Sequence, residues 1–215
     1  MKISDATVRR LPRYRRSLLE LKESHKDRIS SDELSQLVGY TASQIRQDLS
    51  NFGYFGQQGY GYNICNLYNN VNSILGLHRD YKMIVIGAGH LGQALARNIN
   101  SNQSGFQVQA MFDVNPKLIG MMIQNIKIYD YGVLDEYLKR NDVDIGIISA
   151  LKNNAQEIAD KLCKGRVRGI WNFTSQDLIV EKGVVIENVH LSDSLYSLTY
   201  QINKIRTHME NNGGD

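Results

Sequence analysis

The stretch from residue 82 to residue 113 constrains the fold of this chain more than any other. Residues 82–86 form a short apolar run, a glycine-rich turn follows it, and residues 93–97 read as helix. A second apolar run, residues 108–112, ends at Asp113. Strand, glycine turn, helix, strand and acid in this order are typical of a Rossmann-type dinucleotide site. The turn reads Gly87, Ala88, Gly89, His90, Leu91 and Gly92.

Each glycine of the turn has its own physical role. Gly87 permits a tight turn, Gly89 lets the backbone approach a pyrophosphate, and Gly92 lets the helix pack closely. The helix N-terminus offers unpaired N–H groups and a positive dipole end to the phosphates. Asp113 can accept hydrogen bonds from both ribose hydroxyls and would repel a 2′-phosphate, so NAD(H) is expected rather than NADP(H). The alternative is a glycine turn that serves packing alone, with Asp113 and Val114 opening a second turn.

The bulk composition fits a globular protein of two small domains or one large one. Of the 215 residues, 42% are hydrophobic, and no run approaches the length of a membrane span. The N-terminus has no secretory apolar region, so a cytoplasmic protein is expected. Cys65 and Cys163 stand far apart without metal-ligand spacing and are expected to be buried small residues in a reducing compartment. The five histidines are scattered, so we expect no metal site.

Charge is concentrated at the N-terminus. The first 50 residues carry the whole formal net charge of +3, and the remainder sums to zero. A basic N-terminus on a neutral body suggests a polyanionic partner, and a merely solvated basic face is the plain alternative.

The N-terminal pattern predicts a helix-turn-helix. Apolar residues recur at helical spacing over residues 8–21, where Pro12 is expected to start or kink the helix. A Ser30-x-x-Glu33 capping box opens a second helix that ends at Gly39, and Thr41-x-x-Gln44 opens a third. The alternative is a plain helical hairpin. In the third helix the candidate base-reading residues are Ser43, Gln44, Arg46 and Gln47.

Glycines and aromatics over residues 53–62 predict a β-hairpin wing, with a flexible loop as the alternative. A further helix is expected over residues 66–79, followed by a domain boundary. The predicted domains are residues 1–80, a nucleotide domain over residues 81–190, and a tail over residues 191–215.

Strands and helices alternate through the second predicted domain, as in a doubly wound parallel sheet. Strands are expected at residues 126–128, 144–148, 169–173 and 184–186, and helices at residues 131–140 and 155–164. Ligands of such sheets bind at the carboxyl ends of strands. The residues expected to face a nucleotide there are Ser149, Ala150, Asn172 and Phe173.

The tail has apolar residues at helical spacing from Leu191 to about His208, on a face too broad for one small sheet. We interpret it as an oligomerisation helix. No hydrolase or zinc-protease motif is present in the sequence, and no acid–base pair can be placed beside a nicotinamide. Two other functions stay open at this point: an NAD-dependent oxidoreductase with a helical arm, and a nucleotide-binding interaction protein without a DNA target.

Several short motifs together resemble the Rex family of redox-sensing transcriptional repressors. In the N-terminal part they are Arg10-Leu11-Pro12-Arg13-Tyr14, Gln44-Ile45-Arg46, Asp48-Leu49-Ser50, Phe52-Gly53 and Gly59-Tyr60-Gly61-Tyr62. In the nucleotide part they are the turn from Gly87 to Gly92, Phe112-Asp113, Gly169-Ile170 and Asn172-Phe173. The resemblance covers nearly the whole chain in the same order.

The resemblance implies a homodimer that binds a palindromic double-stranded DNA operator through two winged helices. It implies that NADH releases the DNA, that NAD⁺ competes without releasing it, and that the C-terminal helix is swapped between subunits. The implied DNA contacts include Arg10, Arg46 and, in the wing, Tyr60. Glutamines stand at three positions where relatives have basic residues: Gln47, Gln57 and Gln58. The implied switch positions are Arg16, Asn98 in place of a tyrosine, and His190 in place of an aspartate.

Overall fold

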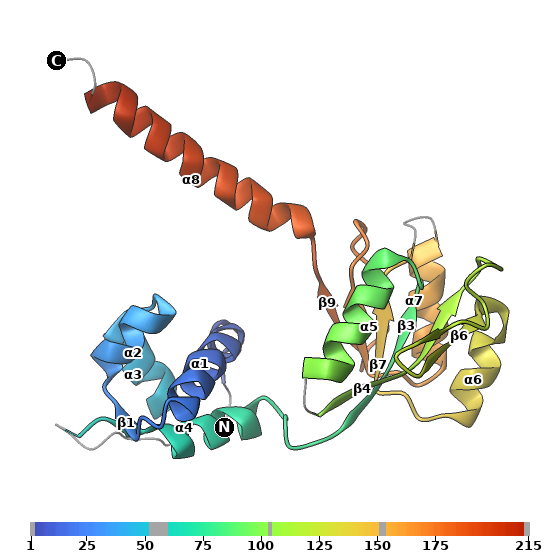
Figure 1. Ribbon diagram of the computed structural model, residues 1–215, viewed down its shortest axis with the longest axis horizontal. Coiled ribbons are helices and arrows are strands. Elements are labelled where there is room, and N and C mark those ends of the chain that lie inside the picture. Colours follow the sequence, from blue (N-terminus) through green and yellow to red (C-terminus); the bar gives the residue numbers. More distant parts are fainter. Residues whose placement is uncertain (1–2, 52–59, 103–104, 151–153, 213–215) are drawn as a thin grey trace. The chain divides into compact units, whose positions relative to one another are not determined.

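The computed structural model describes residues 3–51, 60–102, 105–150 and 154–212 (Figure 1). The chain divides into two compact units, residues 1–79 and 80–215. Within the described residues no helix is both long and apolar enough to cross a membrane.

In its described residues the first unit is a bundle of four helices with a two-stranded sheet. It consists of α1 (Asp5–Glu23), β1 (Arg28–Ile29), α2 (Ser31–Val38), α3 (Ala42–Ser50), β2 (Tyr62–Asn63) and α4 (Ile64–Ile74). Strands β1 and β2 pair antiparallel. The core takes one apolar stripe from each helix, including Leu11, Leu18, Leu34, Ile45 and Leu67, all fully buried. The predicted 66–79 helix therefore begins two residues earlier and ends at Ile74.

Local capping explains where the helices of this unit begin and end. The Ser30 side chain accepts from the Glu33 N–H while the Glu33 carboxylate accepts from the Ser30 N–H, which confirms the capping box. Gly39 ends α2 at φ +70°, in the left-handed region that favours glycine. The Thr41 hydroxyl then accepts from the Gln44 N–H and caps α3. The helix-turn-helix pattern is thus confirmed at both predicted caps.

Pro12 departs from its prediction, because α1 begins at Asp5 and continues through it. Proline removes one N–H donor, which leaves the carbonyl of Val8 without its usual helical partner. Both residues are on the exposed side of α1, where water can satisfy that carbonyl. Buried neighbours on the opposite side, Leu11 and Tyr14, hold the helix in place.

The second unit is a doubly wound sheet with a C-terminal helix. Its elements are β3 (Tyr81–Ile86), α5 (His90–Asn102), β4 (Phe106–Asp113), β5 (Met122–Ile123), β6 (Ile126–Asp130), a 3-10 turn (Tyr131–Val133), α6 (Leu134–Arg140), β7 (Ile145–Ile148), α7 (Ala155–Lys164), β8 (Gly169–Asn172), β9 (Val185–Asn188) and α8 (Leu191–Asn212). The strand order is β5-β6-β4-β3-β7-β8-β9, and only β5 pairs antiparallel. The predicted parallel sheet is confirmed.

Two apolar layers cover the two faces of this sheet. Alternate residues of β3 point to opposite sides: Ile84 and Ile86 pack in the layer with α6 and α7, while Met83 and Val85 pack in the layer with α5. The arrangement of these helices about the sheet can be followed in Figure 1. Strand β5 was not predicted, because it is only two residues long. A two-residue turn joins it to β6, and both turn residues, Gln124 and Asn125, have positive φ.

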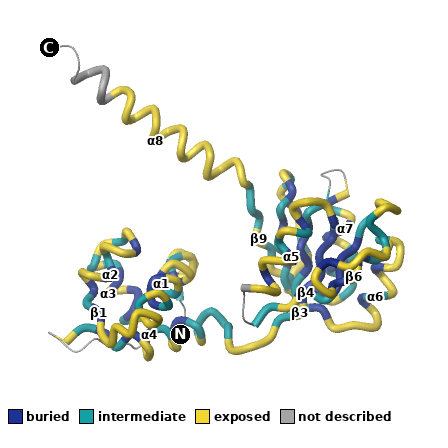
Figure 2. Tube along the Cα trace, in the orientation of Figure 1, coloured by how far each residue is buried: buried dark blue, intermediate teal, exposed yellow. Residues whose placement is uncertain are grey.

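Helix α8 has no packing partner in the described chain. Every described side chain from Leu191 to Thr207 is exposed, including five leucine and isoleucine residues (Figure 2). A helix with that much uncovered apolar surface is typical of an interaction element.

Candidate nucleotide site and nucleic-acid interface

The glycine turn lies at the point where the strand order reverses. Strand β3 has β4 on one side and β7 on the other, and the helices that follow β3 and β7 belong to different layers. The turn begins directly after Ile86, at the carboxyl end of β3. In open α/β sheets this crevice is where ligands bind.

Gly87 and Gly92 are required by close packing. Gly87 has φ +102°, and a Cβ there would lie 2.7 Å from the backbone carbon of Ser149. A Cβ on Gly92 would lie 2.0 Å from the carbonyl oxygen of Gly87. The Ser149 hydroxyl donates to that same oxygen at 2.9 Å, so the ends of β3 and β7 are tied together. Both predicted roles, tight turn and close helix approach, are confirmed.

Gly89 differs from its two neighbours, because a Cβ there would meet nothing within 4 Å. The fold of this chain alone therefore does not require glycine at this position. Open space at the second glycine, next to the start of α5, is what a pyrophosphate would need. His90 and Leu91 form the exposed first turn of that helix, and Ala88 is buried beneath it.

Asp113 connects the end of β4 to the glycine turn. Its Oδ2 accepts from the Ala88 N–H at 2.6 Å, and its Oδ1 accepts from the Asn115 N–H at 2.8 Å. The carboxylate is thus held at the crevice in a fixed orientation, with further lone pairs available to ribose hydroxyls. Val114 is exposed beside it.

The residues that end β7 and β8 are placed differently from one another. The backbone of Ser149 and Ala150 lies against the glycine turn, and their predicted contact with a nucleotide stays a prediction. The Asn172 side chain is fully buried and turned inward, where its amide donates to the Gln176 carbonyl and the Asn188 side chain. Its Oδ1 accepts from the backbone N–H and the hydroxyl of Thr174. The Asn172 side chain therefore uses its polar atoms inside the protein and does not point them at the crevice. Phe173 packs on Trp171 in the α5 layer, with ring centroids 4.7 Å apart.

Helix α3 presents three of its predicted base-reading side chains to solvent. Ser43, Arg46 and Gln47 are exposed, and Gln44 is half-buried. Arg46 Nη1 donates to the Ser31 hydroxyl at 2.8 Å, so its guanidinium is held beside the start of α2. Tyr60 is exposed, and the Arg28 guanidinium lies 6.0 Å from its ring centroid. Gln57 and Gln58 lie outside the described residues.

A buried carboxylate holds α3 against α1, and sequence reasoning missed it. Asp48 is 2% exposed and accepts from Thr7 Oγ1 at 3.1 Å and from Tyr14 Oη at 2.7 Å. Arg10 donates to the two Asp48 oxygens at 2.7 and 2.6 Å. The available signal was an aspartate between Ile45 and Leu49, on the face of α3 that is otherwise apolar.

The network shifts the pKa values of its members. Burial by itself raises the pKa of Asp48, but hydrogen bonds from Arg10, Tyr14 and Thr7 outweigh it, so the pKa lies below its usual range. Burial and the bond to Asp48 raise the pKa of Tyr14 well above that of a free tyrosine. Arg10, predicted as a DNA contact, is thus engaged inside the unit and only 16% exposed in its side chain.

The three predicted switch residues lie on different elements of the two units. Arg16 is exposed on α1 of the first unit. Asn98 is exposed on α5, at the edge of an apolar pocket of about 480 Å³ that Leu95 and Trp171 also line. The His190 ring Nε2 lies 3.0 Å from Asp177 Oδ1, just before α8 begins.

Among the described residues no group of three or more His, Cys, Asp or Glu side chains could hold a metal ion. Cys163 is half-buried, and Cys65 is exposed on α4, so the expectation that both cysteines are buried is wrong for Cys65. Its side chain falls on the polar face of α4, opposite Leu67 and Val71.

The fold and the two sites define a class of protein: a helix-turn-helix unit joined to a Rossmann-type nucleotide-binding unit. Family models agree, because one described as "Putative DNA-binding protein N-terminus" matches residues 2–50 and one described as "CoA binding domain" matches residues 78–176. The redox-sensing transcriptional repressor Rex of Clostridium botulinum (strain Hall) is 56% identical over 94% of this chain and 96% of its own length. Rex of Clostridium perfringens is 52% identical over 94% of this chain and 95% of its own. The chain belongs to the Rex family of redox-sensing transcriptional repressors.

Solved structures agree with this assignment. RSP, described as a Rex-family repressor, matches with a TM-score of 0.89 and 47% identity over 100% of both chains. RSP in complex with β-NADH matches at TM-score 0.89 and 46% identity, over 98% of this chain and 99% of that one. RSP in complex with β-NAD⁺ and operator DNA matches at TM-score 0.88 and 48% identity, over 100% and 99%. Relatives that match along nearly the whole chain are named repressors, which argues against the oxidoreductase interpretation.

Proposed function

We propose that this chain is an NADH-responsive repressor that binds a palindromic operator through its N-terminal unit and leaves it when NADH binds the second unit. The observation that carries the proposal is Gly89. Its backbone is open on the side where a Cβ would point, while both flanking glycines are required by packing. An open backbone at a helix N-terminus suits a pyrophosphate and serves no purpose in the fold alone.

The nucleotide is NAD(H) rather than its 2′-phosphorylated form. Asp113 is fixed beside the glycine turn by two backbone N–H donors. A 2′-phosphate at the ribose would face this carboxylate at close range, and the repulsion would be strong in a partly buried crevice. RSP has been solved in complex with β-NADH and, together with operator DNA, in complex with β-NAD⁺.

The DNA-binding surface is the exposed side of α3. Ser43, Arg46 and Gln47 supply groups that suit base edges or phosphates, and Asp48 anchors the opposite side of the same helix. Gln57, Gln58 and Tyr60 are proposed to lie in the wing, and Arg10 acts by holding α3 in addition to any phosphate contact. RSP has been solved with operator DNA.

The working unit is a homodimer in the cytoplasm. Leu191, Leu195, Leu198, Ile202 and Ile205 of α8 leave an apolar face uncovered, and a second copy of the chain would cover it. A dimer places two α3 helices on two half-sites, which is the arrangement that a palindrome requires. Arg16, Asn98 and His190 are the proposed switch positions between the two states.

Operator release measured by fluorescence anisotropy tests the proposal. Genomic fragments bound by the protein supply the operator, and NADH, NAD⁺ and NADPH are then titrated into the complex. NADH should release the DNA, NAD⁺ should raise the NADH needed without releasing it, and NADPH should act only at about tenfold or greater concentration.

Gly89→Val is the matched control for this measurement. It should bind the operator like the wild type, because the position is open in the fold, and it should not respond to NADH. An operator complex of the wild-type protein that ignores NADH, or that responds equally to NADPH, would contradict the proposal.

A further inference from the structure

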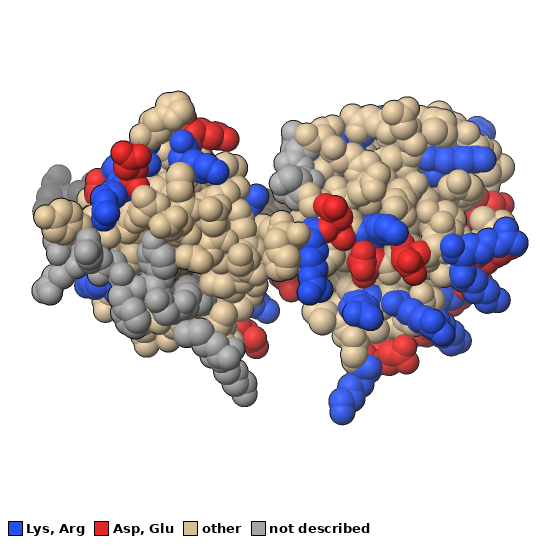
Figure 3. All heavy atoms as spheres, turned by 90° about the horizontal axis from the view of Figure 1, so that it is seen from below, with Lys and Arg blue, Asp and Glu red and all other residues tan. Residues whose placement is uncertain are grey.

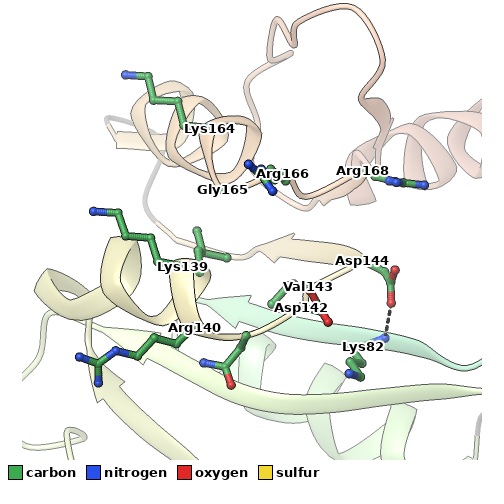
Figure 4. Close-up of a pocket in the computed structure, with 12 residues that line it drawn as sticks. Lys82, Lys139, Arg140, Asp142, Val143, Asp144, Lys164, Gly165, Arg166 and Arg168 are labelled. Carbon is green, nitrogen blue, oxygen red and sulfur yellow. Dashed lines mark hydrogen bonds between the residues drawn. The ribbon is translucent and has the colours of Figure 1, made fainter.

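A basic hollow lies at the end of the sheet opposite the glycine turn. It surrounds the amino ends of β3, β7 and β8 and the C-terminal ends of α6 and α7, and its volume is about 860 Å³ (Figure 4). Glycine turn and hollow are thus separated by the length of β3. The cations that line the hollow are Lys82, Lys139, Arg140, Lys164, Arg166 and Arg168.

Among the described residues, most of these cations lack a salt-bridge partner. Arg140 pairs with Glu136, but in the described part of the chain no salt bridge engages the other five. The hollow also contains Asp142 and Asp144, and Asp144 is occupied by the backbone N–H of Lys82 at 2.9 Å. All six cationic side chains are exposed. Lys and Arg side chains lie on the second unit in the view from below, with Asp and Glu side chains among them (Figure 3).

The helix ends explain only part of this charge. The C-terminus of a helix carries about half a negative charge, and cations there are favourable. Two helix ends, α6 and α7, account for about one elementary charge. Six cations and two carboxylates line the hollow, so positive charge remains in excess after the two helix ends are taken into account.

Arg166 lines the hollow, and its backbone has a conformation that favours glycine. It has φ +65°, and its N–H donates to the Cys163 carbonyl while the Val167 N–H donates to the Leu162 carbonyl. This pair of bonds is the Schellman ending of α7, with Arg166 at the left-handed position. Glycine stands one residue earlier, at 165, where a Cβ would lie 2.6 Å from Leu138 Cδ1. The tight contact brings the ends of α6 and α7 together, and Arg166 lies between them (Figure 4).

We propose that the hollow binds a compact ligand with three or more linked phosphates, as in a nucleoside triphosphate or a free polyphosphate, separately from the dinucleotide. Its volume falls in the range of small-molecule sites, and six cationic residues from three segments of the chain line it: residue 82, residues 139–140 and residues 164–168. A DNA duplex would instead be matched by a basic patch or stripe that runs across one face of the protein. A ligand here would not compete with the dinucleotide, because the glycine turn is at the other end of the strands.

Calorimetry with inorganic tripolyphosphate tests the site in the full-length protein. The titration is run at low salt with excess NAD⁺ present, so that the glycine turn is occupied. Binding should persist, and Arg166→Gln with Arg168→Gln should weaken it about tenfold. The control pair Arg97→Gln and Lys117→Gln removes two exposed cations elsewhere in the same unit and should change the affinity less than threefold.

A second pair, Lys139→Gln with Lys164→Gln, repeats the test at helical positions where glutamine is well tolerated. It should also weaken binding about tenfold. Agreement between the two pairs would show that the loss does not come from a folding defect caused by the substitution at Arg166. Titration with ATP distinguishes the two sources of phosphate: tighter binding than tripolyphosphate identifies a nucleotide, and equal binding identifies free polyphosphate.

Three results would overturn the proposal. Loss of tripolyphosphate binding in the presence of NAD⁺ would place the probe in the glycine turn. Equal binding by the wild type and both hollow variants would show that the hollow is not the site. Unchanged tripolyphosphate binding with weaker, less salt-dependent binding of non-operator duplex by the variants would make the surface a DNA contact instead.

Discussion

Arg10 and Asp48 form a two-point ion pair that fixes α3, the proposed DNA-binding helix, to the rest of its unit. Arg10 Nε donates to Asp48 Oδ2 at 2.7 Å and Arg10 Nη2 donates to Oδ1 at 2.6 Å. Asp48 is on the inner face of α3, whose outer face carries Arg46 and Gln47. The orientation of the exposed side chains therefore depends on a carboxylate that is almost completely buried.

Asp48→Asn should destabilise the first unit by about 3 kcal/mol, because it leaves the Arg10 guanidinium without its charged partner in a largely buried site. Urea unfolding measures the change. Glu136→Gln is the control, since it breaks the exposed Arg140 pair and should cost about 0.5 kcal/mol or less. A loss below about 1 kcal/mol for Asp48→Asn would mean that the pair contributes little beyond packing.

The same pair should make the protein sensitive to acid. The folded pKa of Asp48 is below that of the unfolded chain, so its stabilising contribution is complete above about pH 4 and is lost as the pH falls through the folded value. Urea midpoints between about pH 6 and pH 2.5 should therefore fall less steeply for Asp48→Asn than for the wild type. Glu33 also titrates in this pH range, since hydrogen bonds from Lys26 and Ser30 lower its pKa to about 2. The variant Glu33→Gln measures the contribution of this exposed carboxylate separately. If the urea midpoints of the wild type and Asp48→Asn fall in parallel with pH, Asp48 is not the source of the acid sensitivity.

Gly89 and Gly92 should respond differently to substitution. Gly92→Ala places a Cβ 2.0 Å from the Gly87 carbonyl oxygen, so it should destabilise the second unit by about 1–3 kcal/mol and abolish nucleotide binding. Gly89→Ala should leave stability within about 0.5 kcal/mol while weakening NADH binding. Thermal unfolding with NADH calorimetry measures both effects. Equal thermal stability of the two variants would contradict the packing argument.

Removal of residues 191–215 should abolish the dimer, because the exposed apolar face of α8 would belong to the interface. Sedimentation velocity should show a monomer that aggregates through the surface that α8 had covered. Removal of residues 213–215 alone is the control and should leave the dimer intact. A truncated protein that still sediments as a stable dimer would show that α8 is dispensable for assembly.

Arg166→Gly should stabilise the second unit by about 1 kcal/mol, since glycine adopts φ +65° without the steric cost that other residues carry. Arg166→Ala removes the same charge and keeps that cost, so it should give no comparable gain. Urea midpoints of the two variants measure the difference. An equal gain for both would indicate that relief of charge repulsion in the basic hollow, rather than backbone strain, limits stability.

The sequence by itself determined the features that depend on neighbouring residues. The caps at Ser30 and Thr41, the end of α2 at Gly39 and the strand–helix alternation with its glycine turn all follow from hydrogen bonds, φ angles and periodicities within a few residues. Such interactions are encoded locally, so a reading of the chain in order recovers them. The positions of the glycine turn and of Asp113 were predictable for the same reason, because the turn follows β3 directly and Asp113 ends the next strand, β4.

Only the tertiary structure decided which polar groups are buried and which cations line one hollow. Asp48 meets Thr7, Arg10 and Tyr14 across some forty residues of chain, and Asn172 turns inward to a network rather than toward the crevice. The cations that line the basic hollow come from three separate segments of the chain. Pro12 remains inside α1 because long-range packing of Leu11 and Tyr14 outweighs a local preference. These outcomes depend on contacts between distant segments, whose free energies no local pattern of residues expresses.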